Sequence, residues 1–163
     1  MNTFLNTDTL LALDFVTLAP AGRTAPAVMD ELHGGLVGLD VVTDPDGFRH
    51  DLIKRHARGP ACLDADVALI HARTVAVDRF VLAAGRSSEG VLFDEAHPAI
   101  RLVFLIGAPA GEIQEYLRRA ALLVRLVRRP GFKKALLAAV DSDAFRSVWV
   151  SAQEREEAFR QGA

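Results

Sequence analysis

A histidine and an arginine are the residues of this chain whose types and positions best suit chemistry. His71 directly follows the apolar run Val67-Ala68-Leu69-Ile70, which predicts a buried strand. In an α/β sheet, ligands and reactive groups gather just outside the strand ends, so His71 is a candidate nucleophile. The alternative is a histidine that only caps the strand or hydrogen-bonds a loop.

Arg55 stands on a helix whose start is well marked. Asp44 can cap a helix that begins at Pro45 and ends near Gly59-Pro60. Phe48 and Leu52 define its apolar face, and Arg55, seven residues after Phe48, projects from nearly the same face. A guanidinium there is unusual, and its fork of donors suits phosphoryl oxygens. The alternative is a side chain that extends to the surface or forms an ion pair.

The elements that must position these residues alternate along the chain. Apolar runs predict strands at 11–17, 67–70, 79–84, 91–93 and 101–107. Helical spacing and capping residues predict helices at 24–37, at 45 to about 59, at 111 to about 129, at 132–140 and from 142 onward. Strands bordered by helices in this way favour a three-layer α/β/α fold, in which helices cover both faces of a mixed sheet.

Length and composition limit the number of domains and the kinds of partner and compartment expected for this chain. The 163 residues fit a single domain over 1–163, and 19 basic against 21 acidic residues argue against a nucleic-acid partner. The longest uncharged apolar run, 102–111, is too short to cross a bilayer. The single cysteine, Cys62, excludes an internal disulfide and fits the cytoplasm.

No cofactor or metal is expected. The chain has no P-loop, no Gly-x-Gly-x-x-Gly and no Gly-x-Ser-x-Gly motif. His56, Cys62, Asp64 and His71 match no recognised zinc spacing.

The stretch from Arg55 to Arg73 resembles the active-site region of the fructose, mannitol and nitrogen-regulatory type of enzyme IIA domain, from the bacterial phosphoenolpyruvate-dependent phosphotransferase system (PTS). In that family an arginine precedes by about sixteen residues a strand end like Ala-Ile-Pro-His, whose histidine accepts a phosphoryl group. The match corresponds here to Arg55 and to Leu69-Ile70-His71. Similar strings recur in family order at 77–79, 85–87, 90–94, 101–109 and 128–132.

The resemblance implies the enzyme IIA fold and a phosphohistidine at His71, formed from an HPr-type carrier and held by Arg55. Departures surround these two residues: His56 replaces a usual glutamate, and Tyr116 stands where many members have a second histidine. Asp64 and Asp66 would repel a phosphoryl group if they lay within a few ångströms.

Two functions follow from this resemblance. The first is a phosphocarrier that is classed as a phosphotransferase if the site works, regulatory and nitrogen-type rather than sugar-transporting. The second is a degenerate enzyme IIA-fold module that regulates a protein partner without phosphotransfer. Neither requires a membrane-embedded part of this chain.

Overall fold

The structure is a computed structural model that describes residues 11–162. Its strands are β1 (Phe15–Thr17), β2 (Ala61–Asp64), β3 (Val67–Thr74), β4 (Val81–Val91) and β5 (Ile100–Pro109). Its helices are α1 (Ala25–Gly38), α2 (Pro45–His56), α3 (Ile113–Val127), α4 (Pro130–Ala138) and α5 (Ser142–Gly162). Residues 1–10 and 163 lie outside the described residues, so one domain over 1–163 stays a prediction.

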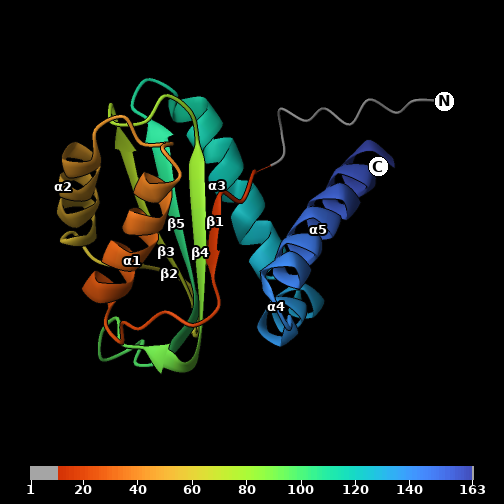
Figure 1. The fold of residues 1–163 in the computed structure, drawn as a ribbon. Helices are drawn as coiled ribbons and strands as arrows, with labels where there is room; N and C mark the ends of the chain where they lie inside the picture. Colours follow the sequence, from red (N-terminus) through yellow and green to blue (C-terminus); the bar gives the residue numbers. More distant parts are fainter. Residues whose placement is uncertain (1–10, 163) are drawn as a thin grey trace.

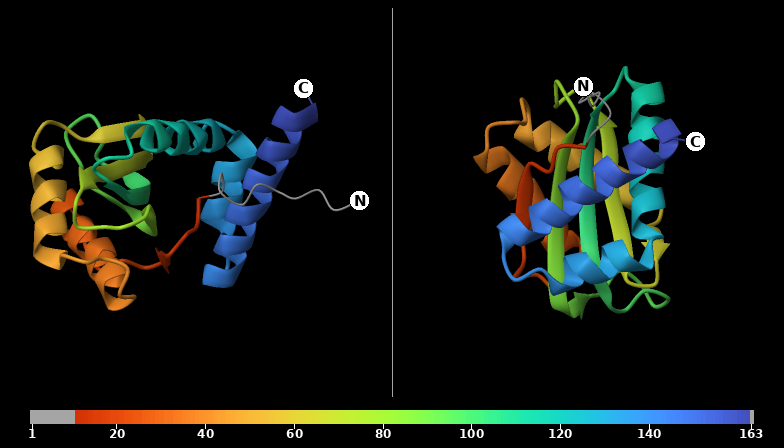
Figure 2. Two further views of the ribbon diagram at one scale, coloured as in Figure 1. Left: turned by 90° about the horizontal axis from the view of Figure 1, so that it is seen from above. Right: turned by 90° about the vertical axis from the view of Figure 1, so that its right-hand side faces the viewer.

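The strands form one mixed sheet in the order β1-β4-β5-β3-β2. β1 runs parallel to β4 and β3 runs parallel to β5, whereas β4–β5 and β2–β3 are antiparallel. Helices α1 and α2 cover one face, and α3, α4 and α5 cover the other (Figures 1 and 2). The predicted three-layer α/β/α fold is therefore confirmed.

Alternation along β3 sends its side chains into two separate cores. Val67 and Leu69 pack with the α3–α5 layer, while Ala68 and Ile70 pack with α1 and α2. His71 continues the first series, so it projects toward the α3 side of the sheet.

The structure corrects several predicted strand boundaries. β3 continues to Thr74, so His71 lies within the strand rather than after its end. No strand was predicted at 60–66, but this stretch contains β2. Of the strand predicted at 91–93, only Val91 belongs to a strand, as the last residue of β4 after a register shift, while Leu92 forms an isolated bridge with Thr24. The strand predicted at 11–17 covers only Phe15–Thr17.

Close packing fixes helix α2 against the sheet. The fully buried Phe48 ring lies over Gly107 of β5, where an added Cβ would stand 2.7 Å from Phe48 Cζ and 2.8 Å from Val81 Cγ2. At the start of the helix, Asp44 Oδ1 accepts a hydrogen bond from the Gly47 N–H (3.0 Å), as the capping prediction required. Helix α2 therefore approaches β5 closely, and its last turn reaches the sheet beside β3.

Helix α5 docks on α3 through a buried carboxylate. Glu156 is only 4% exposed. Its Oε1 pairs with Arg125 Nε at 3.3 Å, and its Oε2 pairs with Arg129. Two cations compensate one buried charge, so this contact ties the later turns of α5 to the C-terminal end of α3, the helix that carries Tyr116.

Candidate functional site

An open stretch of sheet edge creates the site. β2 pairs with β3 only at residues 67–69 of β3, whereas β5 pairs with β3 along its whole length. Beyond Leu69, the outer edge of β3 has no strand partner among the described residues. Side chains from both helical layers can therefore meet around His71 at this edge.

The chain path brings Arg55 to this edge. After α2 ends at His56, only four residues lead to Ala61, which pairs with Leu69 of β3. The last turn of α2 must therefore lie beside residues 69–71. Arg55 Nη1 donates a hydrogen bond to the Gly59 carbonyl oxygen (3.2 Å), and Gly59 has a φ of +118°, a conformation that favours glycine. The turn thus holds the guanidinium at the pocket.

His71 is held in its neutral form. Its pKa is lowered from 6.5 to about 4, mainly by burial and then by the charge of Arg55. The backbone of Leu69 raises this pKa in part. Its Nδ1 is the one buried side-chain nitrogen or oxygen without a hydrogen-bond partner in the described part of the chain. Because Nδ1 is buried out of reach of solvent, we expect a ligand to meet the ring at Nε2. At neutral pH it carries a free lone pair whenever the proton is on Nδ1.

Tyr116 of α3 forms the opposite wall of the site. Its ring stacks on the His71 imidazole, with centroids 5.6 Å apart and planes inclined by 26°. Burial raises the pKa of Tyr116, and the charges of Arg55 and Arg73 lower it in part, so both guanidinium groups act on this hydroxyl. Tyr116 thus stays a neutral donor at physiological pH and limits the rotation of the imidazole.

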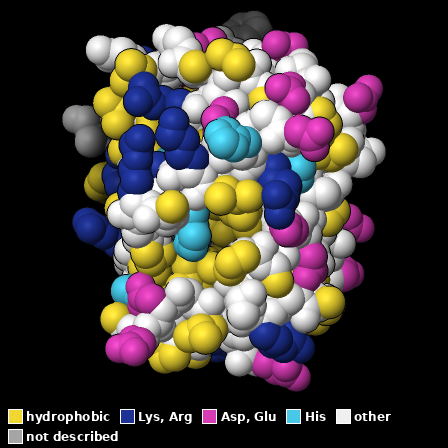
Figure 3. Space-filling model, turned by 90° about the vertical axis from the view of Figure 1, so that its left-hand side faces the viewer, with side chains coloured by type: hydrophobic (Ala, Val, Ile, Leu, Met, Phe, Trp, Pro, Cys, Tyr) yellow, Lys and Arg dark blue, Asp and Glu magenta, His cyan; other side chains and the backbone are white. Residues whose placement is uncertain are grey.

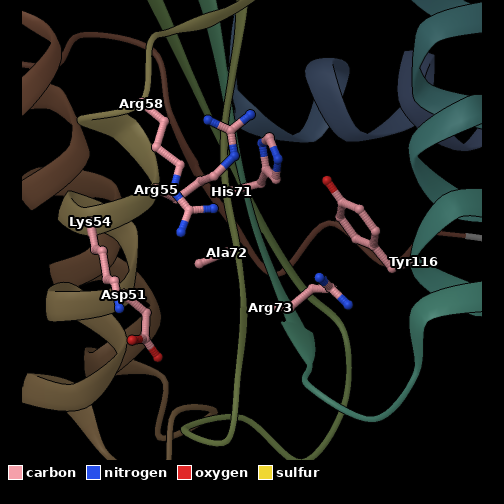
Figure 4. A pocket seen from close by; sticks show the side chains of 8 residues that line it. All are labelled: Asp51, Lys54, Arg55, Arg58, His71, Ala72, Arg73 and Tyr116. Atoms are coloured by element: carbon pink, nitrogen blue, oxygen red, sulfur yellow. The ribbon is translucent and has the colours of Figure 1, made fainter.

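These residues line a cavity of about 380 Å³ (Figure 4). Its lining consists of Asp51, Lys54, Arg55, Arg58, His71, Ala72, Arg73 and Tyr116. Four of these side chains are cationic and one is a carboxylate, and Figure 3 shows Lys and Arg side chains gathered on the α2 side of the molecule. The cavity is therefore suited to an anion.

Four lining residues were not predicted from the sequence: Asp51, Lys54, Arg58 and Arg73. Spacing carried a signal for two of them: Arg73 follows His71 by two residues in a strand and so shares its face, and Asp51 precedes Arg55 by one helical turn. Asp51 has a structural task as well. Its Oδ2 accepts a hydrogen bond from Thr74 Oγ1 (2.7 Å), which joins α2 to the end of β3.

Three other expected site residues lie away from the cavity lining. Asp64 and Asp66 accept hydrogen bonds from Lys133 Nζ of α4 at 2.8 and 2.9 Å. His71 is five positions beyond Asp66 along the chain, which in an extended strand is about 16 Å. His56 is not part of this lining, but with Arg55 and His71 it lines a second, smaller crevice, and it meets the Phe93 ring edge-on at 6.0 Å. Burial, followed by the charge of Arg55, lowers the pKa of His56. The expected repulsion from Asp64 and Asp66 therefore has no counterpart in the lining.

Neither a metal centre nor a membrane span is found in the described part. Within residues 11–162, no three His, Cys, Asp or Glu side chains come together so as to hold a metal ion. None of the described helices is long and apolar enough to span a bilayer.

Curated relatives match most of this chain. It is 26% identical to a fructose-specific EIIA component of Haloferax volcanii over 86% of this chain and 92% of that one. It is 29% identical to a fructose-specific EIIABC component of Bacillus subtilis over 85% of this chain, but it spans only 22% of that longer protein.

Solved structures share the fold at lower identity. The nitrogen regulatory protein IIA-Ntr of Neisseria meningitidis superposes with a TM-score of 0.76 at 19% identity, over 87% of this chain and 97% of the other. The mannitol IIA protein of Escherichia coli gives a TM-score of 0.72 at 18% identity, over 85% and 98%.

The family match covers most of the sequence and includes the residues of the site. Residues 9–149 match the family described as phosphoenolpyruvate-dependent sugar phosphotransferase system, EIIA 2. With His71 and Arg55 at the open edge of β3, and with the fold of solved EIIA proteins, the chain belongs to the EIIA 2 family of the phosphoenolpyruvate-dependent sugar phosphotransferase system.

Proposed function

We propose that this EIIA domain is a phosphohistidine carrier and that His71 Nε2 is the atom that receives the phosphoryl group from an HPr-type protein. The Nε2 lone pair forms the new N–P bond as the P–N bond of the donor phosphohistidine breaks. The bonding electrons of the broken bond return to the donor nitrogen. Neither a metal nor a redox partner is needed to balance this exchange.

The observation that carries the proposal is a neutral imidazole inside a cationic pocket. A protonated ring cannot attack phosphorus, and burial beside Arg55 lowers the pKa of His71 to about 4. Phosphoryl transfer depends mainly on positioning and on stabilising charge that spreads over the phosphoryl oxygens. Arg55 supplies a fork of donors, and Tyr116 supplies a ring wall and a neutral hydroxyl.

The proposal also concerns which branch of the phosphotransferase system the domain serves, nitrogen regulation or sugar uptake. We infer a cytoplasmic, nitrogen-regulatory carrier with a protein target, and Cys62 is a free thiol, as the cytoplasm allows. A second candidate function is transfer to an EIIB-type acceptor in sugar uptake. Both curated relatives are described as fructose-specific, which favours this candidate. The two candidates share the first step at His71 and differ in the acceptor.

Intact-mass analysis tests the shared step. After incubation with phosphoenolpyruvate, enzyme I and HPr, one acid-labile phosphoryl group is expected on the wild type and on His50→Ala, an exposed-histidine control, but not on His71→Ala. An unmodified wild type beside demonstrably phosphorylated cognate HPr would instead favour a binding module without phosphotransfer. Adding a fructose-type EIIB then separates the branches, because only the sugar-uptake function predicts loss of the label to that acceptor.

A further inference from the structure

The cavity carries more positive charge than one phosphoryl group requires. Lys54, Arg55, Arg58 and Arg73 face a single carboxylate, so with a neutral His71 the lining has three positive charges in excess. A phosphoryl group carries about 1.5 to 2 negative charges at pH 7. The volume of about 380 Å³ falls within the range of small-molecule sites, about 300–1,000 Å³.

Three of these cations have no ion-pair partner among residues 11–162. Lys54, Arg58 and Arg73 form no salt bridge there, although surface arginines elsewhere do: Arg49 pairs with Asp30, and Arg79 pairs with Asp14. Asp51, the one carboxylate of the lining, is held by Thr74. The unpaired charges are therefore available to a ligand.

The cations enter the cavity from two directions. Arg73 rises from β3, and its charge acts together with that of Arg55 on the Tyr116 hydroxyl, beside His71. Lys54 and Arg58 enter from α2 and from the turn that follows it (Figure 4). A second anionic group next to the phosphoryl position would thus meet a second pair of cations.

We propose that this pocket binds the diphosphate group of a small molecule. One phosphate lies near His71 between Arg55 and Arg73, and the next lies between Lys54 and Arg58. While bound, the ligand covers Nε2 and keeps the phosphorylated donor away from His71. The binding site itself goes beyond the proposed function, and only its inhibitory consequence rests on that function.

Calorimetry on the unphosphorylated protein tests the binding. At equal ionic strength, inorganic pyrophosphate is expected to bind at least tenfold more tightly than orthophosphate. The double variant Lys54→Gln/Arg58→Gln should lose at least tenfold in pyrophosphate affinity, which is about 1.4 kcal/mol. Arg128→Gln/Lys134→Gln removes the same two charge types from exposed positions at α3 and α4, outside the pocket, and should bind like the wild type. ADP, AMP and pyrophosphate compared in parallel show whether a nucleoside adds affinity.

Several outcomes would overturn the proposal. These are equal affinities for pyrophosphate and orthophosphate, an equal loss in the two double variants, and tighter binding of an acidic peptide than of pyrophosphate, which would assign the cations to a protein partner. Binding is read without phosphotransfer, so an inert His71 would not disturb this assay. Where His71 is phosphorylated, pyrophosphate should slow its labelling, with half-inhibition near the calorimetric Kd.

Discussion

Acidification should destabilise the native protein through His71. The unfolded imidazole takes up its proton near pH 6.5, whereas the native pKa is lowered to about 4 by burial and by Arg55. Between these values the unfolded chain holds more protons than the native one. The free energy of unfolding therefore falls as the pH drops from 6.5 toward 4, and it is unaffected by His71 above that window.

The size of this effect follows from the two pKa values. At 1.36 kcal/mol per pH unit, the interval from 6.5 to about 4 corresponds to at most about 3 kcal/mol. The ring is only partly buried, so solvent screening reduces the expected loss to roughly 1–2 kcal/mol. The effect is large enough for urea titrations to resolve.

The assay compares wild type with His71→Gln in urea at pH 7.0, 5.5 and 4.5, with His50→Gln as an exposed-histidine control. Subtraction of the variant removes the contribution of carboxylates that titrate in the same range. NMR titration of the His71 ring should give a midpoint well below 6.5, and Arg55→Gln should raise it because one positive charge is lost. A His71 midpoint at or above 6.5, or parallel pH profiles for wild type and His71→Gln, would refute the reasoning.

Three further predictions test how the site is built. Arg55→Lys keeps the charge but loses the fork, so single-turnover phosphorylation of His71 should slow at least tenfold while the free energy of unfolding changes by less than about 1 kcal/mol; equal transfer rates would remove Arg55 from the site. Asp64→Asn/Asp66→Asn should lower stability in urea by about 0.5–1 kcal/mol through loss of the Lys133 pairs, with phosphorylation within about twofold of wild type, and faster labelling would show that these charges reach the pocket. Gly107→Ala should cost about 1–3 kcal/mol of stability because the new Cβ meets Phe48, and an unchanged urea midpoint would show that α2 moves freely over β5.

The sequence predicted those parts of the fold that depend on local patterns. The cap and proline at the start of α2 and the apolar period of α3 depend on neighbours within a few residues, and both helices are found where expected. Strand ends were less accurate because hydrogen bonding to a partner strand decides them. β3 continues to Thr74 because it pairs with β5 as far as Pro109. β2 forms because Ala61 pairs with Leu69 of β3.

The candidate site, too, was predicted from the sequence only in part. Residue type and spacing alone determined His71 and Arg55 as candidates, and the resemblance to enzyme IIA domains selected Tyr116 as their companion. Only the tertiary structure decided that β2 stops short of His71, which opens the edge where α2 and α3 approach each other. It also decided that Lys133 engages Asp64 and Asp66, while Lys54, Arg58 and Arg73 form no salt bridge with any described residue and line the cavity that holds His71. Charges far apart in a sequence acquire their partners only when packing sets the distances between them, and electrostatic energy depends on those distances.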